Sequence, residues 1–225
     1  PLLIRCKNDK LELPAEILIG CEKFKYGIKY HNVMVHKMML KHQILLKLTE
    51  NKESEFSIHE ISKILGKDYK NVYNSVKSLG DSICKKKKQN TTYISFFPKL
   101  NEDTFLVEME RRNEILRNRK IKLIFEDMKK LHNPFFVALV FGSYAKGNFS
   151  KHSDIDICII HNNTEEFKQV YNALSVHPEI EIHDFNYKDF CQMLNQKSYN
   201  VGHAIMQEGI ILQNLEAFYK LIEDG

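Results

Sequence analysis

Two aspartates, Asp154 and Asp156, stand one residue apart in an apolar stretch of the sequence. Successive side chains of a β-strand point to opposite faces, so a strand over 154–160 would place both carboxylates on one face, about 7 Å apart. Such a pair repels itself unless a cation lies between its members, and Mg²⁺ typically takes one or two carboxylates together with substrate phosphates. The pair therefore predicts a site for a divalent cation and a phosphate compound.

The residues before the pair could hold the phosphates. Gly142 lets backbone N–H groups approach a phosphate closely, Ser143 adds a hydroxyl donor, and a helix that begins there would point its positive end at the anion. Lys146 would add charge nearby. Taken alone, Gly142-Ser143 could be an ordinary turn, and the two aspartates could lie on a solvated strand face. The order of an apolar strand at 135–141, Gly-Ser, helix and strand favours a joint nucleoside triphosphate and metal site.

The sequence Gly-Ser-Tyr-Ala-Lys-Gly at 142–147, followed by Ser-Asp-Ile-Asp at 153–156, resembles the DNA polymerase β-like nucleotidyltransferase superfamily. Within it, the minimal nucleotidyltransferase branch is most similar, although that branch often has Arg where Lys146 stands. The resemblance covers residues 132–215. It implies an α/β domain with a mixed sheet, Mg²⁺ or Mn²⁺ as cofactor, and transfer of a nucleoside monophosphate from an NTP to a hydroxyl acceptor.

The family also uses a third carboxylate on a neighbouring strand. Residues 164–174 have helical spacing, and a strand is expected over 179–185. Glu181, flanked by isoleucines, best matches the third acidic position, where the family more often has Asp. Glu179 and Asp184 remain alternatives.

The resemblance assigns roles to these residues. Asp154 and Asp156 would hold the metal ions, and Glu181 would ligate the ion beside the attacking hydroxyl. His183 shares the strand face of Glu181 and is interpreted as a polar neighbour rather than an acid. The predicted nucleotide-binding residues are Gly142, Ser143 and Lys146.

Charge divides the chain into two parts. The 225 residues are 43% hydrophobic and 28% charged, which fits one large or two small globular domains, and the charge distribution favours two. Residues 1–100 hold 19 Lys and Arg against 10 Asp and Glu, a net charge of +9, whereas residues 101–225 hold 14 against 19, a net charge of −5. A basic half beside an acidic half indicates that the first binds a polyanion and the second binds metal and nucleotide. The alternative is plain surface solvation by lysine.

Residues 31–100 are predicted to form a winged helix-turn-helix domain. They show two helices, a short turn, a third helix and a hairpin, and the helix at 57–65 opens with a capping box of Ser57 and Glu60. The resemblance to this DNA-binding fold rests on pattern, without a diagnostic motif. The alternative is a helical domain for dimerisation or protein contact. Predicted nucleic-acid contacts lie on the third helix and on the basic strand of the hairpin: Lys70, Asn71, Asn74, Lys77, Lys85, Lys86, Lys87 and Lys88.

The remaining segments complete an α+β fold. Residues 1–30 form an amino-terminal extension to which no role is assigned, 101–131 are predicted as a linking helix, and 132–225 as the nucleotidyltransferase domain. Five cysteines show no paired spacing, so neither a zinc site nor a disulfide framework is expected. The sequence has no apolar run near 20 residues and no signal-like segment, which predicts a cytoplasmic protein without a membrane partner.

Two functions remain open. One is a metal-dependent nucleotidyltransferase that a winged helix brings to nucleic acid, with DNA favoured over RNA. The other is a DNA-binding transcriptional regulator or antitoxin whose nucleotidyltransferase-like domain only binds nucleotide. A homodimer and a HEPN-type protein partner are further candidates for assembly.

Overall fold

The computed structural model describes residues 38–131 and 135–224 of the chain. The predicted extension at 1–30 and the first residues of the helix expected from Val35 lie outside the described residues.

The amino-terminal part contains three helices and a small antiparallel sheet with the strand order β1-β3-β2. Its buried side chains come from all of these elements, and the predicted capping box is present, since Ser57 and Glu60 each accept the other's backbone N–H. The predicted order of helices and hairpin is therefore found. The elements are α1 (Leu40–Thr49), β1 (Phe56–Ser57), α2 (Ile58–Leu65), α3 (Tyr69–Ser78), a 3-10 turn at Gly80–Ser82, β2 (Ile83–Lys88) and β3 (Thr91–Phe96).

The single linking helix predicted over 101–131 is wrong, because this segment forms two helices, α4 (Glu102–Ile115) and α5 (Arg119–Lys129). Asn118 starts the second helix, since its side chain accepts the backbone N–H groups of Lys120 and Ile121. The second helix also buries an apolar stripe against the carboxyl-terminal sheet: Ile121, Ile124 and Met128.

The carboxyl-terminal part is built on a four-stranded mixed sheet with the order β6-β5-β4-β7. Strands β5 and β6 are parallel, whereas β4 is antiparallel to both β5 and β7. The sheet is mixed, as predicted. Its elements are β4 (Val137–Val140), α6 (Gly142–Lys146), β5 (Ile155–His161), α7 (Thr164–Leu174), β6 (Ile180–Asn186), α8 (Tyr187–Leu194), α9 (Val201–Glu208), β7 (Ile210–Gln213) and α10 (Leu215–Asp224).

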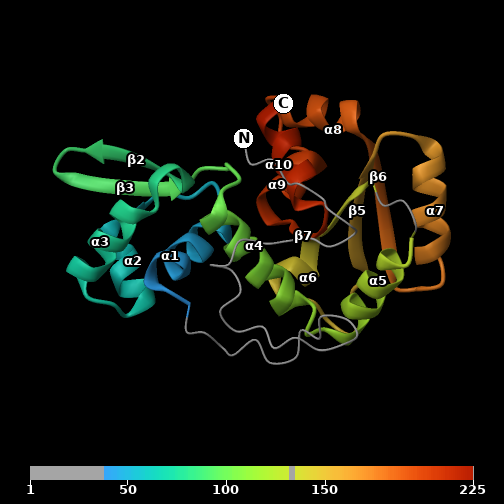
Figure 1. Cartoon of the computed structure of the whole chain (residues 1–225), viewed down its shortest axis with the longest axis horizontal. Coiled ribbons are helices and arrows are strands. Elements are labelled where there is room, and N and C mark those ends of the chain that lie inside the picture. Colours follow the sequence, from blue (N-terminus) through green and yellow to red (C-terminus); the bar gives the residue numbers. More distant parts are fainter. Residues whose placement is uncertain (1–37, 132–134, 225) are drawn as a thin grey trace, which may run out of the picture. The chain divides into compact units, whose positions relative to one another are not determined.

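Alternation along the strands divides the core into two layers. Ile155, Ile157 and Ile159 pack with α5 and α7 on one face of the sheet, whereas Cys158 and Ile160 pack with α8, α9 and α10 on the other (Figure 1). Asp156 alternates with these isoleucines, so its carboxylate lies on the side of the sheet that α8 to α10 cover.

A buried ionic network attaches α4 to the carboxyl-terminal part. Glu108 is fully buried, and its carboxylate accepts one bond of 2.8 Å from the Arg111 guanidinium and another of 2.8 Å from the Tyr219 hydroxyl. Arg111 also donates to the carbonyl oxygen of Gly209 at 3.1 Å. Helix α4 is thus hydrogen-bonded to α10 and to the residue that precedes β7.

No helix within the described ranges combines the length and hydrophobicity needed to cross a bilayer.

Candidate functional site

Two acidic side chains and a histidine converge at one end of the sheet. The parallel register of β5 and β6 places Asp156 opposite Glu181, and His183 follows one alternation step further along β6. His183 Nε2 lies 3.6 Å from Asp156 Oδ1 and 3.5 Å from Glu181 Oε1. One ligand atom from each of the three residues lies within 4.8 Å of the other two. We call these three residues the Asp-Glu-His group.

Asp154 lies just outside this group. It directly precedes β5, its side chain is exposed, and it does not belong to the set of three converging ligand atoms. Its negative charge nevertheless acts on Asp156. Partial burial raises the pKa of the Asp156 carboxyl, the nearby His183 opposes that rise, and the charges of Glu181 and Asp154 add to it. A bound cation would relieve this repulsion.

The absence of a side chain at Gly142 leaves space for the Asp156 carboxylate. The turn from β4 into α6 holds Gly142 at a φ of +65°, where residues with a side chain are strained, and a Cβ there would overlap Asp156 Oδ2 and lie 3.1 Å from its Cγ. The backbone N–H of Phe141 also donates to the carbonyl oxygen of Asp156 at 3.1 Å. Ser143 follows within α6 and is half-buried. The Gly142 turn and the Asp156 carboxylate are therefore direct neighbours.

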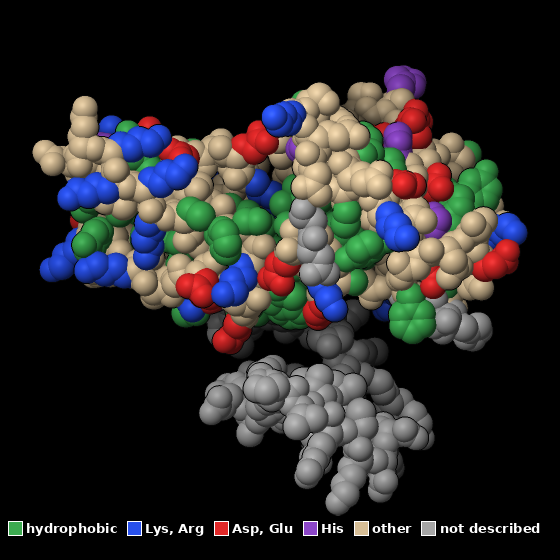
Figure 2. Space-filling model, turned by 90° about the horizontal axis from the view of Figure 1, so that it is seen from above, with side chains coloured by type: hydrophobic (Ala, Val, Ile, Leu, Met, Phe, Trp, Pro, Cys, Tyr) green, Lys and Arg blue, Asp and Glu red, His purple; other side chains and the backbone are tan. Residues whose placement is uncertain are grey.

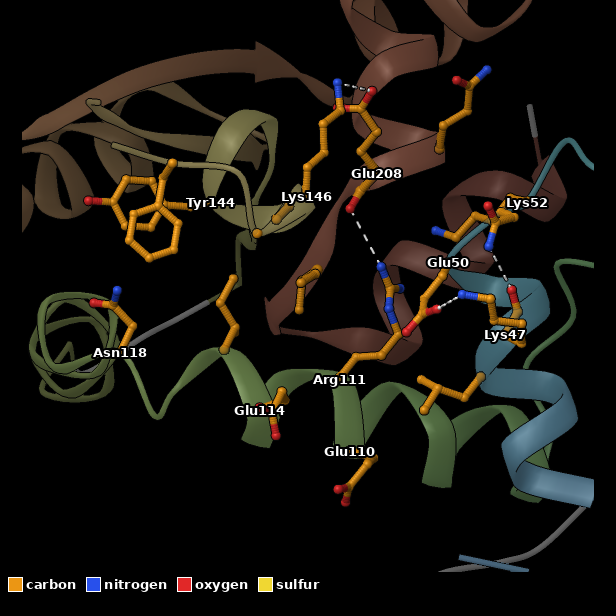
Figure 3. Close-up of a pocket in the computed structure, with 18 of the residues that line it drawn as sticks. Lys47, Glu50, Lys52, Glu110, Arg111, Glu114, Asn118, Tyr144, Lys146 and Glu208 are labelled. Carbon is orange, nitrogen blue, oxygen red and sulfur yellow. Dashed lines mark hydrogen bonds and ion pairs between the residues drawn. The ribbon is translucent and has the colours of Figure 1, made fainter. Parts of the chain in front are cut away.

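The Lys146 side chain contacts Glu208 rather than the Asp-Glu-His group. Its Nζ lies 2.8 Å from Glu208 Oε1, and this hydrogen bond raises the pKa of Lys146. Both residues line a cavity of about 1000 Å³ between α1, α4, α6 and the end of α9, which no member of the Asp-Glu-His group lines. Figure 3 shows Lys146 and Glu208 side by side at this cavity with Arg111 beneath them. As a phosphate ligand, Lys146 would have to leave Glu208.

Two lysines that line the cavity are bonded within the protein. Lys52 donates to the carbonyl oxygen of Met206 at 2.8 Å, and Lys47 forms a 3.0 Å ion pair with Glu50. Burial, assisted by the positive charge of Arg111, lowers the pKa of Lys52 to about 8. At this cavity, hydrogen bonds from Lys52 and Arg111 to the backbone carbonyls of Met206 and Gly209 join the two parts of the described chain.

Part of the chain matches a known protein family. Residues 119–216 match the family described as polymerase beta, nucleotidyltransferase. Residues 119–216 form a polymerase beta nucleotidyltransferase domain. The match runs from α5 to the start of α10 and includes Gly142, Asp154 and the Asp-Glu-His group. A search of curated proteins found no match to the chain.

The predicted nucleic-acid contacts lie outside the nucleotidyltransferase domain and are all exposed. Lys77 of α3 lies over the Tyr73 ring, with Nζ 4.5 Å from its centroid. In the β2–β3 hairpin, Lys86 and Lys88 pair with Glu55 at 2.8 and 2.5 Å. Figure 2 shows several Lys and Arg side chains gathered over this part of the molecule. The exposed contacts are Lys70, Asn71, Asn74, Lys77, Lys85, Lys86, Lys87 and Lys88.

The structure adds His183 to the candidate site. The structure places its Nε2 beside Asp156 and Glu181, in a group that could hold a metal ion, whereas the sequence interpretation made it a polar neighbour. The available signal was the alternation of Glu181 and His183 on one face of a strand next to Asp156. The partnership of Lys146 with Glu208 carried no local signal, because 62 positions separate the two residues in the chain.

Proposed function

We propose that the protein is a metal-dependent nucleotidyltransferase, in which the acceptor hydroxyl attacks the α-phosphate of an NTP and pyrophosphate leaves. The proposal is carried by one observation: Asp156 and Glu181, on adjacent parallel strands, converge beside the Gly142 turn inside a nucleotidyltransferase domain. Asp154, Asp156 and Glu181 are the proposed catalytic residues. The acceptor class is left to experiment.

The residues at this site fit a divalent cation. Carboxylate oxygens are the ligands that Mg²⁺ and Mn²⁺ take in proteins. Nε2 of His183 is buried and has no hydrogen-bond partner among the described residues, although it faces two carboxylates. Asp156 and Glu181 would hold the ion, and Asp154 would add a ligand from the exposed side. A bound ion lowers the pKa of an attacking hydroxyl and stabilises charge on a leaving phosphate.

The Gly142 turn would orient the triphosphate. Backbone N–H groups at Gly142 and Ser143, together with the Ser143 hydroxyl, would bind the β- and γ-phosphates and keep the leaving group in line with the acceptor. Lys146 would add a positive charge to the phosphate site once the phosphate displaces Glu208. The Lys146 side chain is 50% exposed, and ion pairs at such positions contribute little stability, so this exchange is energetically accessible.

We further propose that residues 31–100 form a winged helix-turn-helix domain that binds nucleic acid, DNA rather than RNA. The described residues support this through the helix order, the three-stranded sheet and the exposed polar side chains of α3. The four consecutive lysines of β2 suit contact with phosphates.

A second function has specific support. Glu181 is 59% exposed and Asp154 lies outside the Asp-Glu-His group, so the carboxylates are less tightly gathered than a dedicated two-metal site requires. A transcriptional regulator or antitoxin whose nucleotidyltransferase domain only senses nucleotide would tolerate this arrangement.

Labelled nucleotides test the two functions against each other. The purified protein would be incubated with Mg²⁺ and each α-³²P-labelled NTP, alone and with RNA, DNA or cell lysate. Transfer of label that is lost in Asp154→Asn and in Asp156→Asn would establish the enzyme and identify its acceptor. NTP binding without transfer would favour the sensor. DNA binding is expected to survive both substitutions, and its loss would contradict separate roles for the two parts.

A further inference from the structure

His183 brings a nitrogen ligand to a site that otherwise consists of carboxylates. Its ring is held by the strand pairing of β6 with β5 and by an edge contact with Phe141, with ring centroids 5.0 Å apart at an angle of 70°. This orientation directs Nε2 at Asp156 and Glu181. The imidazole is therefore positioned in advance, and it would not have to swing in to meet an ion.

The separations fit shared coordination better than direct bonding. The Nε2 to oxygen distances of 3.5 and 3.6 Å exceed a normal hydrogen bond. Two ligands at about 2.1 Å from one ion would themselves be about 3.4 Å apart in a tetrahedral site, as around Zn²⁺, and about 3.0 Å apart in an octahedral one. His183 Nε2 is also buried and makes no hydrogen bond within the described chain. A metal ion would give this buried nitrogen a partner.

We propose that Asp156, Glu181 and His183 form one mixed nitrogen and oxygen site that prefers first-row transition-metal ions over Mg²⁺, with Mn²⁺ as the spectroscopic probe of its ligands. Imidazole suits transition-metal ions such as Zn²⁺, Fe²⁺ and Ni²⁺, whereas Mg²⁺ prefers oxygen ligands and retains its waters. This inference rests on the proposed function for the presence of a metal and deepens it by naming the class of ion. His183 is then a metal ligand rather than a general acid.

Bound Mn²⁺ reports its ligands directly. Electron spin-echo spectroscopy of the Mn²⁺-loaded protein is expected to show coupling to an imidazole ¹⁴N. The coupling should disappear in His183→Asn and persist in His203→Asn. His203 is a matched control because it is half-buried, has an unbonded ring nitrogen within the described chain and lies outside the Asp-Glu-His group. Circular dichroism would verify that each variant is folded.

Affinity gives a second measure. His183→Asn should weaken Mn²⁺ binding about tenfold or more, since even the loss of a residue that only orients a ligand costs about that much. The affinity for Mg²⁺, measured by competition with Mn²⁺, should change much less. Glu181→Gln should weaken binding of both ions, because it removes an oxygen ligand.

The outcomes separate this inference from the proposed function. Mn²⁺ that fails to bind, or that binds without ¹⁴N coupling, overturns the mixed site even if label transfer from NTP is observed. Nitrogen coupling without any label transfer supports the mixed site and contradicts the transferase.

Discussion

The α-carbon of Gly142 faces the carboxylate of Asp156 so closely that no side chain fits between them. A Cβ at this position would overlap Asp156 Oδ2, and the backbone there has a φ of +65°. Glycine is therefore required twice, by conformation and by space. The same contact joins the turn proposed to bind phosphate to the carboxylate proposed to bind metal.

Gly142→Ala should reduce NTP-dependent label transfer by about 100-fold, since a displacement of about 1 Å at a catalytic group has that effect. Gly147→Ala is the matched control. It lies at the other end of α6 with a φ of +71°, and a Cβ there would meet no described atom within 4 Å. Both substitutions should lower the free energy of unfolding by about 1–2 kcal/mol through backbone strain. Equal losses of activity would show that crowding of Asp156 is unimportant.

Arg111→Met should lower the free energy of unfolding by about 3–5 kcal/mol, because it leaves the buried Glu108 carboxylate without its charged partner. Arg117→Met removes the equally spaced pair with Glu114, whose side chains are 71% and 61% exposed, and should change stability by less than about 1 kcal/mol. Urea denaturation measures both values. A similar small effect for the two variants would contradict a stabilising role for the network.

Glu55→Gln should strengthen nucleic-acid binding. Hydrogen bonds from Lys86 and then Lys88 hold the pKa of Glu55 at about 2, so Glu55 is ionised and competes with phosphates for both lysines. Releasing two cations should steepen the salt dependence of binding by about two units of slope. Asp81→Asn, which removes an exposed carboxylate paired with Lys99, is the control for net charge. Equal changes in the two variants, measured by fluorescence anisotropy, would contradict a specific role for the hairpin.

Stability should rise with pH above 8 because of Lys52. Its pKa is lowered from an ordinary 10.5 to about 8 in the folded protein, so between these values the unfolded chain binds more protons. Unfolding then becomes less favourable as pH rises, by about 1–2 kcal/mol between pH 7.5 and 9.5. Denaturation at the two pH values measures this increase. Lys52→Met should remove it, and a persisting increase would assign the effect to another group.

Local patterns in the sequence were sufficient for most elements. The helix predicted over 164–174 has those bounds in α7, and strands were expected around Asp156 and Glu181, where β5 and β6 lie. The capping box at Ser57 and Glu60 was also found. These features depend on residues a few positions apart, which is why the sequence alone reveals them.

The remaining features depend on contacts between distant segments. Lys146 was assigned to phosphate from its position after the Gly-Ser turn, but its side chain pairs with Glu208, which only the folded chain brings near. His183 became a candidate ligand once the register of β5 and β6 was known. The break between α4 and α5 is different, because Asn118 is a local cap that the apolar periodicity of the segment concealed.

The bonds that Glu108 and Arg111 make outside their own helix have a thermodynamic consequence. Tyr219 and the Gly209 carbonyl, their partners, lie near or beyond the end of the family match, whereas α4 lies before its start. Unfolding α4 alone would expose these partners and leave them unbonded. Residues 38–224 should therefore melt in one calorimetric transition, and the segment 119–216 by itself should lack part of what keeps it folded.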